Sequence, residues 1–246
     1  MQLSANGSAR AKVQRNSRVP DGESYYTHSR PEVVRLLPED VRQVIDVGCG
    51  AGALGASIKA ALPRAQVRGV EYVPSQAERA KSVLDDAVAA DAAAAPPAAW
   101  PAPDCLVFAD VLEHLIDPWA TLSAWRARCA PQAWAVMSIP NVSHMSVLSG
   151  LKCGRFEYAA EGLLDRTHLR FFTRVSACEM VEQAGFEIVR LERTFNFPGP
   201  GLRRSLLSAW VRARYEPELA RERIFAARQT LLDSLTFQFL ILARAK

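Results

Sequence analysis

Short apolar runs alternate with amphipathic segments along this chain, and the alternation predicts an α/β fold. The runs are rich in valine and isoleucine, which is typical of strands buried in a sheet. Several segments between them repeat apolar positions with the period of a helix. Strands are expected at 44–47, 67–71, 87–91, 104–108, 134–140, 186–192 and 236–243, and helices at 31–37, 53–62, 75–85, 120–129 and 176–184. We therefore expect a doubly wound, Rossmann-like sheet of seven mainly parallel strands.

The junction between the first strand and the first long helix is the most informative stretch. Asp46 lies at the end of the apolar run, and glycines follow at 48, 50, 52 and 55. Glycines let the backbone turn sharply and lie close to a ligand. The junction therefore predicts a nucleotide-like ligand, and two ligand classes compete for it.

The first class is a dinucleotide, because residues 50–55 read Gly-x-Gly-x-x-Gly and Glu71 lies near the position of a ribose-binding acid. The protein would then be an NAD- or FAD-dependent oxidoreductase. Asp46 argues against this, since a carboxylate at the strand end repels a pyrophosphate bound at the helix N-terminus. S-Adenosylmethionine carries an ammonium, a sulfonium and no phosphate, and suits the acid better.

The spacing Asp46-x-Gly48-x-Gly50-x-Gly52 resembles the cofactor loop of class I S-adenosylmethionine-dependent methyltransferases. Residues 109–115 resemble the segment after the family's fourth strand. Residues 140–144 and 162–173 resemble a bacterial subgroup broadly like the ubiquinone O-methyltransferases, often associated with glycan or secondary-metabolite biosynthesis. The resemblance implies methyl transfer to an oxygen, or a ring nitrogen, of a small metabolite or sugar. A non-catalytic S-adenosylmethionine-binding protein stays open as an alternative.

The resemblance also implies roles for individual acids. In this family the acid that ends the second strand, here Glu71, accepts hydrogen bonds from both ribose hydroxyls, and Asp91 falls where the family reads adenine. A structural role, as a turn, capping or solvated acid, is the competing interpretation for each. The residues expected to bind the cofactor are Asp46, Gly48, Cys49, Gly50, Glu71, Tyr72, Asp91, Ala92, Ala109 and Asp110.

The acceptor is expected beyond the carboxyl ends of the strands, where doubly wound sheets bind ligands. A hydroxyl or ring N–H acceptor must lose a proton, and histidine can take it near neutral pH. His144 is the preferred base because it follows the fifth strand most closely. His168 is the second candidate, or it braces its loop through Asp165 and Arg170. A structural role is the alternative for both histidines. The residues expected to contact the substrate are Tyr25, Tyr26, Asn141, His144, Asp165, His168 and Arg170.

Composition narrows the class further. The 246 residues, 49% of them hydrophobic, suit one α/β domain. The net charge of +4 is mild and no dense basic-aromatic face is evident, so we expect no nucleic-acid partner. No signal-peptide core or membrane-spanning stretch is evident, and we expect a cytoplasmic protein with no membrane partner. The five cysteines form no Cys-x-x-Cys pair and no other ligand cluster is evident, so we expect no metal site.

Two segments are expected to depart from the common architecture. Residues 1–22 predict a flexible N-terminal tail that precedes a methyltransferase domain over 23–246. Residues 202–235 show helical periodicity and predict two helices inserted before the last strand. The last two strands of class I methyltransferases usually form a hairpin, so this insertion is unusual. It is a candidate substrate cover or the contact surface of a homodimer.

Overall fold

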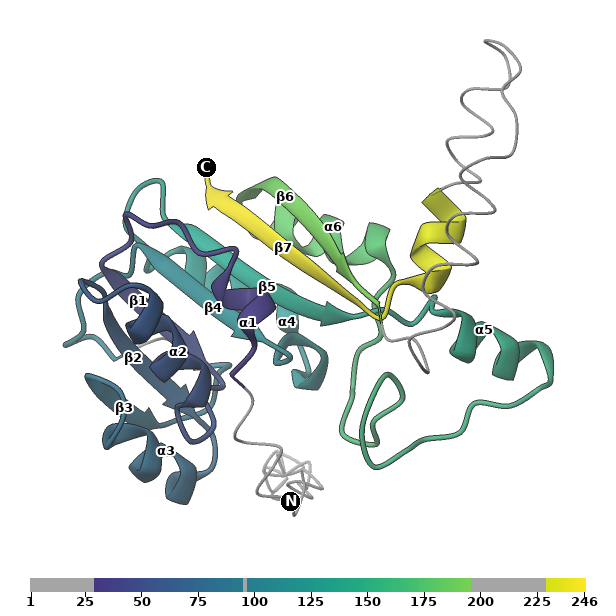
Figure 1. Ribbon diagram of the computed structural model, residues 1–246, viewed down its shortest axis with the longest axis horizontal. Helices are drawn as coiled ribbons and strands as arrows, with labels where there is room; N and C mark the ends of the chain where they lie inside the picture. Colours follow the sequence, from purple (N-terminus) through teal and green to yellow (C-terminus); the bar gives the residue numbers. More distant parts are fainter. Residues whose placement is uncertain (1–28, 95–96, 196–228) are drawn as a thin grey trace, which may run out of the picture.

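A seven-stranded sheet forms the centre of the molecule (Figure 1). The computed structural model describes residues 29–94, 97–195 and 229–246. The strands, in chain order, are β1 (Gln43–Val47), β2 (Gln66–Glu71), β3 (Asp86–Ala89), β4 (Cys105–Ala109), β5 (Trp134–Pro140), β6 (Phe186–Thr194) and β7 (Gln238–Ala245). The helices are α1 (Pro31–Val34), α2 (Ala53–Ala61), α3 (Pro74–Lys81), the 3₁₀ turn η2 (Leu112–His114), α4 (Pro118–Arg126), α5 (Met145–Lys152) and α6 (Arg174–Gln183). A further helix, 229–235, precedes β7.

The strands lie in the order β3-β2-β1-β4-β5-β7-β6. The first five of these run parallel, whereas β7 runs antiparallel to both of its neighbours, β5 and β6. The expected doubly wound, mainly parallel sheet of seven strands is therefore confirmed. The chain winds outward in opposite directions from β1 and β4, and ligands of such sheets bind where the order reverses.

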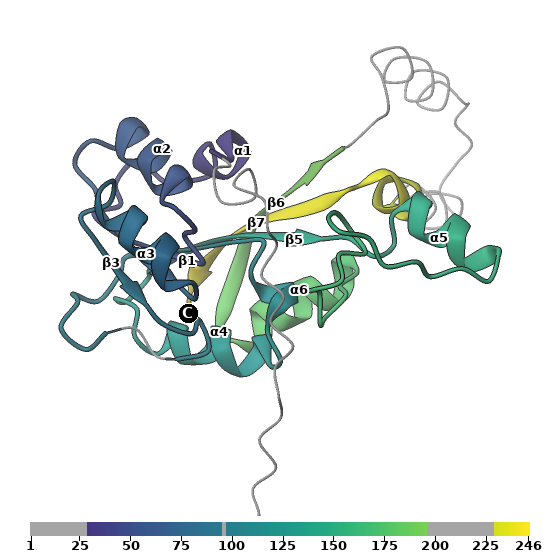
Figure 2. The same ribbon diagram turned by 90° about the horizontal axis from the view of Figure 1, so that it is seen from below.

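Helices cover both faces of the sheet (Figure 2). The buried side chains of α1, α2 and α3 belong to one apolar cluster, which includes Val44 of β1. Those of α4 and α6 belong to a second cluster, which includes the next residue, Ile45. Successive side chains of a strand point to opposite faces, so one strand supplies both clusters. Burial on both faces explains why the strands read as nearly continuous apolar runs.

The observed elements differ from the sequence predictions where the hydrophobic pattern is weak. The third strand ends at Ala89 rather than at residue 91, so Asp91 lies in the loop that follows. Helix α5 was not predicted either; of its apolar side chains only Val147 is buried, whereas Met145, Leu148 and Leu151 are exposed.

Several expectations fall outside the described residues. The proposed tail, 1–22, and residues 202–228 of the proposed insertion are among them. The last part of that insertion, 229–235, is helical, in agreement with its periodicity. Within the described parts of the chain, no helix is both long enough and apolar enough to span a bilayer.

The carboxyl ends of β1, β2, β4 and β5 lie at one edge of the sheet, because these strands are parallel. The loops that leave this edge contain most of the residues singled out by the sequence analysis. Two groups of polar side chains gather there, one beside β1 and β2 and the other beyond β4.

Candidate functional site

Glycines determine the shape of the loop between β1 and α2. Gly48, Gly50 and Gly52 have φ angles of 78°, 54° and 90°, in the left-handed region that favours glycine. A Cβ on Gly48 would lie 2.5 Å from Cγ2 of Val111, in the loop after β4. The backbone at Gly48 therefore packs directly against the neighbouring loop, with no room for a side chain.

Two buried acids flank this loop. Glu71 accepts hydrogen bonds from the backbone N–H groups of Gly50 (2.9 Å) and Val73 (2.8 Å). Burial raises the pKa of Glu71, and the hydrogen bonds to its carboxylate oppose that shift. Asp46 is 1% exposed, and its Oδ2 has no hydrogen-bond partner among the described residues. Burial and, to a lesser extent, the charge of Glu71 raise the pKa of Asp46 to about 7.

These residues fit the chemistry of S-adenosylmethionine. A buried carboxylate oxygen without a donor is unfavourable, and a cationic or hydrogen-bond-donating ligand would remove that penalty at Asp46. Glu71 retains acceptor capacity for a diol, since each carboxylate oxygen accepts more than one hydrogen bond. A pyrophosphate would instead bring more negative charge toward two buried acids.

The other residues expected at the cofactor end occupy different settings. Tyr72 follows β2 and is exposed. Asp91 lies beyond β3, where its Oδ1 accepts the backbone N–H of Ala93 at 2.9 Å. The carbonyl of Ala92 accepts the indole N–H of Trp125 at 2.8 Å, which connects this loop to α4. The side chain of Asp91 therefore shapes a turn, and its role toward the cofactor stays a prediction.

Cys49 and Ala109 lie closer to the sheet. Cys49 is buried, and a Cβ on Gly69 of β2 would collide with its sulfur. Burial also raises the pKa of the Cys49 thiol, so the side chain is a neutral packing group. Ala109 is the last residue of β4 and pairs in register with Ser138 of β5.

Asp110 is held by side chains from three other parts of the chain. Its φ is 59°, a left-handed conformation in the first residue after β4. The carboxylate forms an ion pair with Arg30 and accepts hydrogen bonds from the Ser138 hydroxyl and from Nε2 of Gln238 (2.9 Å). Arg30 also donates to Ser138 at 2.9 Å. The sequence analysis missed Arg30, which lies far from Asp110 in the chain.

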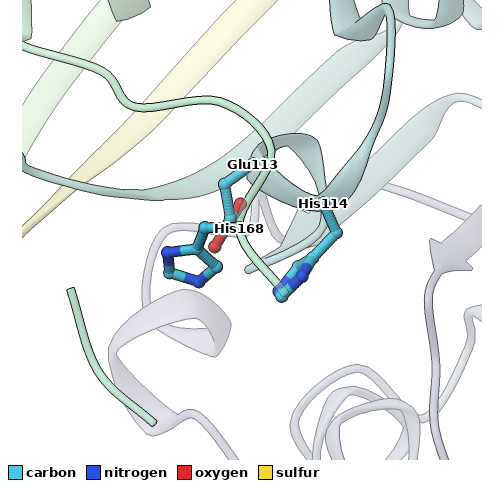
Figure 3. A group of neighbouring side chains, drawn as sticks. All are labelled: Glu113, His114 and His168. Carbon is cyan, nitrogen blue, oxygen red and sulfur yellow. The ribbon is translucent and has the colours of Figure 1, made fainter. Parts of the chain in front are cut away.

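A pocket of about 100 Å³ lies beside Asp110. Glu113 and His114 enter it from η2, and His168 enters it from the loop between α5 and α6 (Figure 3). The imidazole centroids of His114 and His168 are 4.8 Å apart, edge to face. One potential ligand atom from each of the three residues lies within 4.8 Å of the others. We call these three residues the Glu113–His114–His168 cluster.

Burial dominates the electrostatics of this cluster. Glu113 is 1% exposed, and neither carboxylate oxygen has a hydrogen-bond partner among the described residues. Burial and the nearby charge of Asp110 raise the pKa of Glu113 well above its usual value. Burial lowers the pKa of His114, and His168 lowers it further. Burial also lowers the pKa of His168, so both imidazoles are neutral at pH 7.

His144 lies apart from this pocket. It is the N-cap residue of α5, where its Nδ1 accepts the backbone N–H of Ser146 at 3.3 Å. Its ring centroid lies 5.9 Å from that of Phe237. Phe237 lines the pocket, whereas His144 does not. The preferred catalytic histidine and the second candidate are therefore in different settings, one at a helix end and one in a buried cluster.

The remaining substrate candidates divide between supporting and exposed positions. The Asn141 side chain is fully buried and donates to the carbonyls of Asp233 (2.6 Å) and Thr236 (2.8 Å). This corrects the expectation that Asn141 faces a ligand: it fixes the loop after β5 against the segment before β7. Tyr25 and Tyr26 lie outside the described residues.

The expected brace of His168 through two charged neighbours is only partly present. Asp165 is buried and accepts from the N–H and the hydroxyl of Thr167, both at 2.7 Å. Its charge acts on His168, whose pKa it raises against the larger effect of burial. The expected contribution of Arg170 to this brace is not found, because its exposed guanidinium donates to the carbonyl of Ile116 instead.

The sequence holds only a weak signal for the Glu113–His114–His168 cluster. Glu113 and His114 are adjacent in the segment after β4, but His168 is more than fifty residues away. Two backbone hydrogen bonds bring the distant loop to η2: the N–H groups of Leu169 (2.8 Å) and Arg170 (3.0 Å) donate to the Glu113 carbonyl. The spacing of residues in the sequence does not predict this contact between the loop and η2.

A family model described as a methyltransferase domain matches residues 23–191 of the chain. No curated protein matches the chain in sequence.

Solved structures share the fold at low sequence identity. A SAM-dependent methyltransferase from Archaeoglobus fulgidus is 17% identical, with a TM-score of 0.58 over 90% of this chain and 96% of that one. The StiE O-MT is 14% identical, with a TM-score of 0.55 over 89% and 73%. The [4+2]-cyclase SpnF is 18% identical, with a TM-score of 0.55 over 87% and 79%. The fold is thus common to proteins described by different reactions.

Proposed function

The chain belongs to this methyltransferase-domain family, and we propose that it transfers the methyl group of S-adenosylmethionine to an oxygen of a small metabolite or sugar. The observation that carries the proposal is Asp46, a buried carboxylate beside the glycine loop with one oxygen that has no hydrogen-bond partner in the described part of the chain. A ligand with a positive charge and no phosphate is the kind of nucleotide that such an acid stabilises. Glu71, buried at the end of the neighbouring strand, is the proposed ribose acceptor.

The reaction needs alignment and the removal of one proton. The acceptor oxygen forms a bond to the methyl carbon while the bond between that carbon and the sulfonium sulfur breaks, and its electron pair stays on sulfur. The acceptor hydroxyl loses its proton at or before this step. Because the methyl donor is already activated, much of the acceleration comes from holding donor and acceptor in line. The glycine loop and the pocket beside Asp110 both lie at the carboxyl ends of neighbouring parallel strands. This placement supports the alignment of a donor in one with an acceptor in the other.

We assign proton removal to the His114–His168 pair rather than to His144. Both rings of the pair line the pocket, and burial keeps them neutral at pH 7, so each has a nitrogen lone pair. Nδ1 of His144 already accepts a hydrogen bond at the start of α5, and protonation there would break the cap. The position of His144 in the sequence favoured it as the base, but its hydrogen bond to the start of α5 leads us to prefer the His114–His168 pair.

A second candidate function is binding of S-adenosylmethionine without methyl transfer. The likeness to the [4+2]-cyclase SpnF favours keeping it, since a protein with this fold is described by a different reaction. The NAD-dependent alternative is disfavoured by the family assignment and by Asp46, which would face a pyrophosphate at the Gly-x-Gly-x-x-Gly segment.

Calorimetric titration with S-adenosylhomocysteine, and with NAD in parallel, tests the proposed cofactor. We expect the full chain to bind S-adenosylhomocysteine and not NAD. Glu71→Gln should weaken this binding at least tenfold, whereas Glu187→Gln, an exposed acid on β6, should leave it unchanged. Binding of NAD alone would show that the dinucleotide interpretation is right and the proposal wrong.

A further inference from the structure

We propose that Glu113, His114 and His168 bind a divalent transition-metal ion, such as Zn²⁺, that activates the acceptor. The inference rests on the proposed function only in assigning this pocket to the acceptor; the metal site itself stands on the three side chains. No metal site was expected from the sequence.

The geometry of the cluster meets the first requirement of a metal site. One potential ligand atom from each residue lies within 4.8 Å of the other two, close enough for one ion to contact all three (Figure 3). Two backbone hydrogen bonds to the Glu113 carbonyl hold the His168 loop against η2. The three ligands therefore come from two segments that are fixed to each other.

The Glu113 carboxylate is the strongest sign that a cation belongs here. It is 1% exposed, and neither of its oxygens has a hydrogen-bond partner among the described residues. A buried carboxylate without partners is unfavourable as an ion, and a metal ion would compensate it directly. Arg30, whose positive charge acts on Glu113, is already paired with Asp110 and Glu32.

The hydrogen bonds of both histidines orient them as metal ligands. Nδ1 of His114 lies 3.3 Å from the carbonyl oxygen of Thr167, and Nδ1 of His168 lies 3.3 Å from that of Leu163. A carbonyl only accepts, so each contact assigns the proton to Nδ1 and the lone pair to Nε2. Metal-bound histidines commonly donate their other ring N–H to a backbone carbonyl in this way.

The ligand set selects the class of metal. Two neutral imidazoles and one carboxylate suit Zn²⁺, Mn²⁺, Fe²⁺ or Co²⁺, whereas Mg²⁺ and Ca²⁺ prefer oxygen ligands alone. Three protein ligands leave at least one coordination position for water or an acceptor oxygen. A hydroxyl bound there would have a lowered pKa and would release its proton to solvent before methyl transfer. With their lone pairs bound to the ion, the two histidines would hold the metal, and the metal would replace them as the group that promotes proton removal.

Titration of the chelator-treated full chain with Zn²⁺ alone, followed by calorimetry, tests the site without cofactor or acceptor. We expect one tight site, and at least tenfold weaker binding in Glu113→Gln and in His168→Ala. His144→Ala and Cys153→Ser are the matched controls, since the first removes a histidine outside the cluster and the second an exposed thiol. Both controls should bind Zn²⁺ as the parent does.

Thermal melting distinguishes a loss of metal binding from a loss of folding in the variants. Without metal, Glu113→Gln should melt at about the same temperature as the parent, because an amide of similar size replaces a buried carboxyl that has no hydrogen-bond partner among the described residues. With Zn²⁺, the parent should gain stability and the variant should not. Absorption of Co²⁺ bound to the parent gives a further readout that needs no variant: visible bands of nitrogen and oxygen ligation are expected, without thiolate charge transfer.

Equal Zn²⁺ affinity in the parent, Glu113→Gln and His168→Ala would overturn the metal site. Binding of S-adenosylhomocysteine to the metal-free protein separates the two proposals. If that ligand binds and Zn²⁺ does not, only the metal site is wrong; if Zn²⁺ binds and that ligand does not, the proposed function is wrong.

Discussion

Two buried carboxylates, Asp46 and Glu113, lie at the same edge of the sheet in contrasting surroundings. Both are 1% exposed, and both have oxygens without a hydrogen-bond partner among the described residues. Asp46 adjoins a loop in which Gly48, Gly50 and Gly52 adopt left-handed backbone conformations, as in the turn of a nucleotide-binding fold. Glu113 adjoins two neutral imidazoles, whose lone pairs suit a metal ion. The side chains and backbone around each acid thus indicate which kind of cation it would bind.

The comparison also separates two ways of ordering a site. The Asp46 end is built from residues close in sequence, on one strand–loop–helix unit. The Glu113 end depends on a loop that starts after α5 and returns to η2. Changes at the first end should therefore disturb the fold and cofactor binding together, whereas changes at the second should act locally.

The largest expected effect is a pH dependence that originates at Asp46. Its pKa is about 7 in the folded protein and about 3.9 in an unfolded chain. Between these values the folded state keeps a proton that the unfolded state has released, so the free energy of unfolding falls as the pH rises from about 4 to about 7. Asp46→Asn has no such proton and should remove a change of several kcal/mol from the profile.

Denaturant unfolding of the cofactor-free parent and Asp46→Asn across this pH range gives that comparison. Asp165→Asn is the control, a buried acid that is hydrogen-bonded in the folded state. Identical pH profiles for the parent and Asp46→Asn would show that Asp46 does not titrate as its burial implies.

The next effect concerns the glycine loop. Gly48→Ala would place a Cβ 2.5 Å from Val111 at a φ of 78°, so strain and overpacking should together lower the free energy of unfolding by about 2–4 kcal/mol. Gly154→Ala is the matched control, because its φ is 72° but no atom lies within 4 Å of the new Cβ. It should lose only about 1 kcal/mol. Equal losses, measured by urea unfolding, would mean that the contact with Val111 is easily relieved.

Cofactor affinity should separate the two carboxylates. Asp46→Asn replaces a charge with a neutral amide and should weaken S-adenosylhomocysteine binding by roughly 10- to 100-fold, the worth of a charged hydrogen bond. Glu113→Gln should leave that affinity unchanged, since Glu113 lines the pocket beside Asp110 and is not part of the glycine loop. Calorimetry on both variants measures the contrast, and a similar loss in the two would show that the acids serve one common ligand.

The smallest effect is expected at Thr167, which supports the Glu113–His114–His168 cluster. Its hydroxyl donates to Asp165 at 2.7 Å and lies 3.1 Å from Nδ1 of His114. Thr167→Val should lower the free energy of unfolding by about 1 kcal/mol, the typical worth of a hydrogen bond. S-Adenosylhomocysteine affinity should not change. A loss of that affinity would mean that the glycine loop and the Glu113–His114–His168 cluster are coupled more closely than the hydrogen bonds suggest.

The sheet and the cofactor end were largely predictable, because both depend on local patterns. The strands are apolar on both faces, and Asp46 and Glu71 each fall at the end of one. Helix α5 was missed although Met145, Leu148 and Leu151 recur at the spacing of a helix, and these side chains are exposed rather than part of the core. The Glu113–His114–His168 cluster was missed for a different reason: only the docking of a distant loop on η2 creates it. Asn141 is the opposite case. Its sequence position suggested contact with the substrate, but its side chain hydrogen-bonds the backbone before β7 and so has a structural role.

The place of β7 has a consequence for how the chain reaches its final form. β7 follows β6 in sequence but lies between β5 and β6, and among the described strands β6 pairs with β7 alone. During synthesis, the five parallel strands can assemble while β6 still has no partner, and only the arrival of residues 238–245 attaches it to the sheet. Pairings between segments so distant in sequence form slowly. Until they form, the free edge of β5 is the part of the nascent sheet most open to a wrong partner.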